Sequence, residues 1–343
     1  MFTIVGAGAV GGVLGAHLAR AGREVVFCDI AADHVRKINE GGITIDGPEE
    51  TFVARAPAFT PQELVGRGVP LETVFLCVKA QDTETAVKQL LPLLGTEAEI
   101  VSCQNGLCEN IIASVVGPER VIGCFVNFSA DYLEPGRILY GGPSTLVLGE
   151  PDGTISRRVL ELREVLKAWG PVRVSDNIWG YLWGKLSYGA LLFATAMVDA
   201  TMAEVVGNLR YREALLELCS EVLEVADRER VAPLGFDDWE PALVYPRRTR
   251  DTAALSAQWK KLELRMAANR KTKSGIWRDL AVRKRRTEVD FQLVPVIDMG
   301  RRHGLKLPLT SFVVEAIKGL ESGTRSMSWG NLEELKTLYE HQP

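Results

Sequence analysis

Three glycines near the beginning of the chain constrain its fold more than any other feature. Gly6, Gly8 and Gly11 form a G-x-G-x-x-G motif directly after the apolar run at residues 2–5, and they open a helix-like segment. A second apolar run, residues 24–29, completes a strand, tight turn, helix, strand pattern. In such a βαβ start the first glycine permits the turn, the second lets a pyrophosphate approach the backbone, and the third lets the helix pack on the strand.

The motif predicts a dinucleotide bound at the amino terminus of the following helix. The cofactor-binding residues expected in this loop are Gly6, Ala7, Gly8, Ala9, Val10 and Gly11. Asp29 ends the second strand, where a carboxylate can hold the ribose 2′-hydroxyl. The same carboxylate would repel a 2′-phosphate, and no cation occurs at residues 30–33, before Arg36. NAD is therefore favoured over NADP, which stays open.

The alternation of strands and helices continues along the first half of the chain. Residues 73–80 and 98–106 are near-continuous apolar runs, typical of parallel strands buried on both faces. Lys79 and Asn105 follow these runs, at the sheet edge where ligands bind in open α/β folds. Lys79 is expected to contact the cofactor and Asn105 the nicotinamide and the substrate, although a surface lysine and a turn asparagine would look the same.

The pattern changes twice towards the carboxyl end. Residues 120–150 contain short runs with Gly and Pro turns, expected to be antiparallel strands, and residues 172–176 give one more strand. Helical periodicity then takes over. The expected helices are 178–198, 211–228, 254–285, 287–303 and 309–322. The fold class is accordingly an α/β Rossmann domain over 1–177 followed by an all-α domain over 178–343.

Composition narrows the possible partners and the compartment. The net charge of −4 and pI of about 5.8 give no general attraction to nucleic acid or anionic membranes, and the basic runs at 270–275 and 282–286 are interpreted as solvated faces. The six cysteines lack zinc-ligand spacing, so no metal site is expected and the thiols should be reduced. The chain opens with no basic segment or cleavage site, which favours a cytoplasmic protein.

One segment of the chain is unusual because it is apolar and carries a single charge. Residues 178–198 contain only Lys185 as a charged residue. The length is close to that of a membrane span, but three glycines, a serine, two tyrosines and the lysine favour a buried helix. Burial would lower the pKa of the lysine, which suits a proton donor to a carbonyl oxygen. A structural lysine that extends its ammonium group to the surface is the alternative.

Taken in order, the motifs resemble the ketopantoate reductase family over most of the chain. The matching stretches are IVGAGAVGG, CVKA, CQNG, WGKL and RRTEVDF. The resemblance implies a Rossmann domain, a helical domain and an active site in the cleft between them. It also implies Lys185 as the general acid and Glu288 as the residue that positions the substrate and the lysine. Ser274 corresponds to the substrate-binding serine of the family, although its spacing to Glu288 is longer than in the family.

The chain departs from the family pattern beside the lysine. The family has asparagines four and eight residues after it, whereas this chain has Gly189 and Phe193. Gly189 should leave room beside the substrate, and Phe193 either forms an aromatic wall or packs into the core. Residues 236–273 are also longer than the usual connection and bring two tryptophans, Trp239 and Trp259. The pocket is therefore expected to be rebuilt.

These observations predict an NAD-linked oxidoreductase acting on a ketone or 2-oxo acid, or on the corresponding alcohol. Two alternatives stay open. One is an NADPH-dependent 2-dehydropantoate 2-reductase of pantothenate biosynthesis, and the other is a non-catalytic dinucleotide sensor. The expected partner is a small-molecule substrate, with no nucleic acid and no membrane. A homodimer is one possible assembly.

Overall fold

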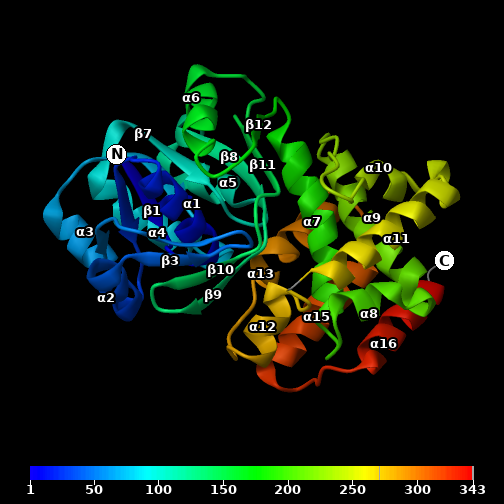
Figure 1. The fold of residues 1–343 in the computed structure, drawn as a ribbon. Coiled ribbons are helices and arrows are strands. Elements are labelled where there is room, and N and C mark those ends of the chain that lie inside the picture. Colours follow the sequence, from blue (N-terminus) through cyan, green and yellow to red (C-terminus); the bar gives the residue numbers. More distant parts are fainter. Residues whose placement is uncertain (270, 342–343) are drawn as a thin grey trace. The chain divides into compact units, whose positions relative to one another are not determined.

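The computed structural model describes residues 1–269 and 271–341. The chain forms two compact units, Met1–Ile178 and Trp179–Pro343 (Figure 1). The boundary between them falls one residue from the division expected at 177/178. Arg270, in the first basic run, and residues 342–343, at the end of the expected all-α domain, lie outside the described residues.

A large mixed sheet organises the first unit. Its strands are β1 (Phe2–Val5), β2 (Val25–Cys28), β5 (Ala58–Phe59), β6 (Leu71–Leu76), β7 (Leu94–Ser102), β8 (Val121–Asn127), β11 (Thr145–Gly149) and β12 (Val172–Val174). Their order is β12-β11-β8-β7-β6-β1-β2-β5. The six strands from β5 to β8 are parallel and have the order of a Rossmann fold, so the strand order reverses beside β1. The predicted α/β class is confirmed.

Helices cover both faces of this sheet, which explains the near-continuous apolar strands. One face packs against α1 (Ala9–Arg20), α2 (Ala32–Gly41) and α6 (Arg157–Leu166). The other face packs against α3 (Pro61–Arg67), α4 (Thr83–Leu90) and α5 (Cys108–Val116). Successive residues alternate between these two cores: Ile4 belongs to the first and Val5 to the second.

A second, smaller sheet packs against α1 on the side away from the large one. Its order is β4 (Thr51–Ala54), β3 (Ile43–Asp46), β10 (Arg137–Tyr140) and β9 (Ala130–Glu134). Glycines of α1 allow the helix to lie between the two sheets. A methyl group on Gly12 would lie 2.1 Å from Ile138 of β10, and one on Gly15 would lie 2.4 Å from Phe27 of β2. The helix can approach both sheets only because these positions carry no side chain.

The expectation of antiparallel strands over 120–150 is only partly correct. β9 and β10 are antiparallel to each other, and β11 is antiparallel to β8. However, β8 is parallel to β7 in the large sheet, and β10 is parallel to β3. The partners of these strands lie far away in sequence, so turn composition within the segment did not reveal them.

The second unit is helical, and it is coloured from green to red in Figure 1. Its helices are α7 (Ile178–Thr195), α8 (Met202–Gly207), α9 (Arg212–Arg228), α10 (Pro241–Val244), α11 (Thr252–Ala268), α12 (Gly275–Ala281), α13 (Val289–Gln292), α14 (Val294–Arg302), α15 (Pro308–Ser322) and α16 (Trp329–Glu340). Short 3₁₀ segments are η4 (Leu209–Tyr211) and η5 (Arg247–Thr249) in this unit, and η1 (Ala80–Asp82), η2 (Leu91–Leu93) and η3 (Pro118–Arg120) in the first unit. Among the described residues, no strand follows β12. No described helix combines the length and apolarity that a bilayer span requires.

The single helix predicted over 254–285 is wrong, because the chain forms two helices there. Asn269 accepts a hydrogen bond from the backbone of Lys271 at 3.0 Å, and Ser274 accepts one from the backbone of Trp277 at 3.1 Å. Short polar side chains that bond to nearby backbone groups compete with helical hydrogen bonds. They end α11 and start α12 despite the continuing apolar pattern.

The long connection over 236–273 contributes to the core of the helical unit. Trp239 is buried and donates from Nε1 to the Ser187 hydroxyl of α7 at 3.0 Å. Trp259, also buried, donates from Nε1 to the Val206 carbonyl at 2.8 Å. The segment therefore supports α7 from the side of Ser187, and its two tryptophans have structural roles.

Candidate functional site

The three glycines of the motif meet three different environments. Gly6 has φ of +91°, and a methyl group there would lie 2.8 Å from the Val78 nitrogen. A methyl group on Gly11 would lie 2.1 Å from the Gly6 carbonyl oxygen and 2.8 Å from the Ile4 side chain. At Gly8 no atom lies within 4 Å. The first and third glycines therefore allow close packing, whereas the second borders open space.

That open space fits the pyrophosphate of a dinucleotide. No side chain caps the amino terminus of α1, and its first turn contains no acidic residue. The first N–H groups of a helix have no acceptor within the helix and attract anions. The loop from Gly6 to Gly11 thus offers backbone donors and room in the same place.

Asp29 connects the end of β2 to this loop. Its Oδ2 accepts a hydrogen bond from the Ala7 nitrogen at 2.8 Å, and its Oδ1 accepts one from the Ala31 nitrogen at 2.9 Å. An ionised carboxylate offers about four lone-pair positions, so both oxygens can still accept from a ribose hydroxyl. Asp29 therefore holds the loop and fits the ribose role expected for it.

A residue that the sequence analysis missed, His34, holds the other side of Ala7. The ring is 1% exposed. The Gly136 nitrogen donates to its Nδ1 at 2.9 Å, so Nδ1 is an acceptor and the proton is on Nε2, which donates to the Ala7 carbonyl at 2.8 Å. A single histidine inside a polar helix pattern gave no signal of this role.

The loops after β6 and β7 are also tied together. Gln104 donates from Nε2 to the Val78 carbonyl at 3.0 Å and to the Thr83 hydroxyl at 2.7 Å. These bonds fix the backbone around Lys79, which directly precedes η1, while Asn105 is exposed at the next position after Gln104. Lys79 and Asn105 thus lie at the carboxyl edge of the sheet as expected, and Gln104 is a buttress that the sequence analysis missed.

The cysteines near this edge are thiols. Among the described residues the six cysteines form no disulfide, and all except Cys77 are buried. Strand register aligns Cys77, Cys103 and Cys124 on neighbouring strands, and the Cys77 Cβ lies 2.9 Å from where a Gly11 Cβ would be. In the part of the chain described, no three His, Cys, Asp or Glu side chains are grouped to hold a metal.

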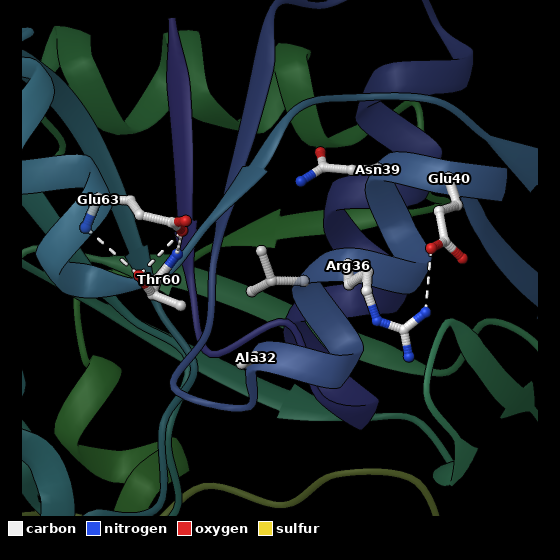
Figure 2. Close-up of a pocket in the computed structure, with 7 residues that line it drawn as sticks. Ala32, Arg36, Asn39, Glu40, Thr60 and Glu63 are labelled. Carbon is white, nitrogen blue, oxygen red and sulfur yellow. Dashed lines mark hydrogen bonds and ion pairs between the residues drawn. The ribbon is translucent and has the colours of Figure 1, made fainter.

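A cavity of about 400 Å³ lies beyond Asp29, between α2 and the start of α3 (Figure 2). It is lined by Ala32, Val35, Arg36, Asn39, Glu40, Thr60 and Glu63. Arg36 donates to Glu40 at 3.0 Å and to Asp33 at 3.2 Å, and Glu63 bonds to Thr60. The Arg36 guanidinium is thus already paired with the carboxylates of Asp33 and Glu40, and the Glu63 carboxylate also lines the cavity.

In the helical unit, the accessible positions of α7 form one stripe. From Tyr181 onwards, its partly exposed residues are Tyr181, Lys185, Tyr188, Gly189 and Leu192. This spacing places them on one helix face, with Lys185 near its centre. Phe193 is 0% exposed and packs in the core, which decides between its two expected roles. Gly189 borders open space: outside the local backbone of α7, the one atom of the described residues within 4 Å of a methyl group there would be Gln292 Oε1, at 3.6 Å.

The remaining predicted residues of this unit are buried. Glu288 directly precedes α13, and its carbonyl accepts from the nitrogens of Phe291 at 3.0 Å and Gln292 at 2.9 Å. Ser274 is buried at the start of α12, and its hydroxyl accepts from the Trp277 nitrogen. Its hydroxyl proton is available for a further acceptor. The catalytic and substrate roles of these residues stay predictions.

Known proteins resemble most of the length of both units. The family model described as ketopantoate reductase PanE/ApbA matches residues 2–153, and the model of its C-terminal part matches residues 177–321. The 2-dehydropantoate 2-reductase of Mesorhizobium japonicum is 31% identical over 264 residues, covering 68% of this chain and 78% of that protein. The enzyme of the same name from Aquifex aeolicus is 26% identical over 325 residues, covering 93% and 96%.

Solved structures show the same fold. A PanE/ApbA family ketopantoate reductase from Ralstonia eutropha superposes with a TM-score of 0.77 at 23% identity, covering 94% of this chain and 99% of that one. D-mandelate dehydrogenase with NADH and anilino(oxo)acetate gives a TM-score of 0.79 at 22% identity, with the same coverage. On the family-model matches over most of its length, this chain belongs to the ketopantoate reductase PanE/ApbA family.

Proposed function

We propose that this NAD(P)-dependent oxidoreductase uses NAD(H) and interconverts a 2-oxo acid with its 2-hydroxy acid, where the substrate side group is bulkier or less polar than that of ketopantoate. The observation that carries the proposal is the open space at Gly189, one helical turn after Lys185 on the accessible stripe of α7. A family member with an asparagine at this position would fill that space with an amide.

Lys185 is proposed as the proton donor and acceptor. It lies at the centre of the accessible stripe, among neighbours that are mostly buried. Bound dinucleotide would supply or accept the hydride at the carbon atom. As the carbonyl carbon gains hydride, its oxygen becomes negative, and the Lys185 ammonium gives it a proton; in oxidation the neutral amine takes that proton back. Glu288 is proposed to orient the substrate and the lysine.

The preference for NAD(H) rests on the charges near the ribose. Asp29 occupies the position that holds a 2′-hydroxyl, and a 2′-phosphate there would meet its negative charge. Arg36 is the nearest following cation, and it is already paired with Asp33 and Glu40. A phosphate would have to compete with both carboxylates for it.

The similar proteins are named after two different substrates. The similar curated proteins named above are 2-dehydropantoate 2-reductases, whereas D-mandelate dehydrogenase was solved with NADH and anilino(oxo)acetate. Gly189 and the buried Phe193, which stand where the family has asparagines, favour a substrate like that of D-mandelate dehydrogenase. The reason is that a pocket without these amides discriminates less strongly for polar groups. Retention of Lys185 and Glu288 argues against a non-catalytic sensor.

Two titrations test the cofactor part of the proposal. Binding of NADH and of NADPH is followed by fluorescence in the wild type and in Asp29→Ala, with Asp298→Ala, a surface carboxylate of α14 that pairs with Arg301, as the control. We expect NADH to bind at least tenfold more tightly, and Asp29→Ala to reduce that ratio by weakening NADH and relieving repulsion of NADPH. Tighter binding of NADPH to the wild type would contradict the charge argument.

A further inference from the structure

Gln292 is a nearly buried polar residue with no structural partner. It ends α13 and is 8% exposed. Within residues 1–269 and 271–341, its side-chain amide makes no hydrogen bond, while its backbone nitrogen bonds to Glu288. Its amide atoms still reach accessible space, so this unpaired amide is free to bind a ligand rather than sealed in the core. Buried Gln258 of α11 differs in that its Oε1 has a structural role: it accepts a 2.7 Å bond from the Glu240 nitrogen, although its Nε2 has no partner among the described residues.

The position of this amide is well defined. Its Oε1 lies 3.6 Å from where a Cβ of Gly189 would be, and apart from the local backbone of α7 no other atom of the described residues lies within 4 Å of that point. Gly189 is four residues after Lys185 on α7, and Gln292 is four residues after Glu288, with a backbone bond between them. The first pair lies on one face of α7, and the second pair spans the single turn of α13. The amide therefore borders the open space one turn beyond Lys185.

We infer that Gln292 is a specificity-determining residue, whose amide donates a hydrogen bond to the carboxylate of a bound 2-oxo acid. The terminal amide of glutamine turns easily about its last torsion, so Nε2 as well as Oε1 can face the space. The inference rests on the proposed function, since it assigns a contact to that substrate. An amide supplied from α13 leaves the position on α7 empty, so the pocket keeps one polar anchor and gains room for a larger side group.

Three substitutions separate the parts of this inference. Gln292→Met keeps the size of the side chain and removes the amide, Gln292→Glu keeps the size and adds a negative charge, and Gly189→Asn places an amide on α7. Gln258→Met is the matched control, because it removes a buried amide that has a backbone partner. Each variant is assayed as the full chain for KM and kcat with ketopantoate and with phenylglyoxylate, for NADH affinity, and for Tm.

We expect Gln292→Met to raise KM of the better substrate at least tenfold, with kcat within about threefold and unchanged NADH affinity, as for loss of a hydrogen bond to a charged group. Gln292→Glu should raise KM further, because it repels the carboxylate. The Tm of Gln292→Met should equal or exceed that of the wild type, whereas Gln258→Met should lower Tm and leave KM unchanged. In Gly189→Asn the effect of Gln292→Met on KM should be smaller, because the new amide can replace it.

A KM within twofold of the wild type on both substrates for Gln292→Met, or a fall in Tm like that of Gln258→Met, would overturn the inference. Failure of the proposed function looks different: the wild type would then prefer ketopantoate, whereas Gln292→Met would still raise KM for ketopantoate at least tenfold, since that substrate carries the same 2-oxo acid carboxylate. A KM that Gln292→Glu leaves unchanged would also overturn the inference, since it would show that no carboxylate lies beside the amide.

Discussion

The glycine-rich loop of the first unit and the accessible stripe of α7 in the second are made in opposite ways. Backbone groups form the loop, and the missing side chains of Gly6, Gly8 and Gly11 decide its shape. Side chains of a helix form the stripe, where Lys185 stands beside a glycine that leaves space. A binding site formed by backbone groups can change its shape little without disturbing the fold of the unit. A site made of side chains can change its substrate while the helix stays the same.

The largest expected effect is on turnover, at the stripe. Lys185→Ala should lower kcat by roughly 100-fold or more, the usual scale of general acid catalysis, with unchanged NADH affinity and unchanged Tm. Steady-state assays and fluorescence titration measure these quantities. Lys88→Ala is a suitable control, because this lysine lies on α4 and pairs with Glu84 on the surface. A fall in kcat of less than threefold, with chemistry shown to be rate-limiting, would make Lys185 a structural residue.

The loop should respond differently, and two of its glycines separate folding from binding. Gly11→Ala should lower Tm and abolish tight NADH binding together, because its methyl group would meet the Gly6 carbonyl at 2.1 Å. Gly8→Ala should leave Tm nearly unchanged and weaken NADH about tenfold or more, because the methyl group occupies the space proposed for the pyrophosphate.

Thermal unfolding and NADH titration of both variants test this separation. Gly66→Ala in α3 is the control, since a methyl group there would also meet no atom within 4 Å. Equal losses of Tm in Gly8→Ala and Gly11→Ala would show that both glycines are structural. Full NADH affinity in Gly8→Ala would mean that the open space is not the phosphate site.

The same contrast explains what could be predicted from the sequence. Gly6, Gly8, Gly11 and Asp29 lie within one βαβ segment, so their spacing alone predicted their arrangement, and the structure agrees with it. The Rossmann and helical fold classes could also be predicted, because the spacing of apolar residues is a local property of the sequence. His34 could not be predicted, because its partner Gly136 is 102 residues away.

The residues of the helical unit show the same limit. Lys185 was recognised as the single charge of an apolar segment and from the WGKL motif, and Gly189 from the family pattern four residues further on. Gln292 was missed, because its relation to Gly189 depends on how α13 packs against α7, and nothing in either local pattern reports that packing. Long-range pairing also explains why the parallel partner of β10 was not expected.

A smaller effect concerns two helix amino termini. The amino terminus of α1 has no side-chain cap. The amino terminus of α15 is capped by the buried Glu221, whose carboxylate accepts hydrogen bonds from the nitrogens of Leu309 at 3.0 Å and Thr310 at 2.7 Å. Burial raises the pKa of Glu221 to about 7, although these donors oppose the shift. A carboxyl pKa that is higher in the folded chain favours folding at low pH.

The stability that this group contributes is therefore complete below about pH 4.5 and is lost as the pH rises through 7, a change of about 3 kcal/mol. Tm of the wild type should fall between pH 5 and pH 8, and Glu221→Gln, which does not titrate, should lose most of this slope. A wild-type Tm that rises over this interval, or an unchanged slope in Glu221→Gln, would contradict the account of this cap.

Substrate choice tests the central claim most directly, because the claim is that the stripe of α7 was rebuilt while the loop was retained. Ketopantoate and phenylglyoxylate are mixed at equal concentration with enzyme and NADH, and the two hydroxy acids are quantified at low conversion. The product ratio equals the ratio of kcat/KM values. We expect at least tenfold more hydroxy acid from phenylglyoxylate. An excess of pantoate, with a kcat/KM for ketopantoate above about 10⁴ M⁻¹s⁻¹, would contradict the account.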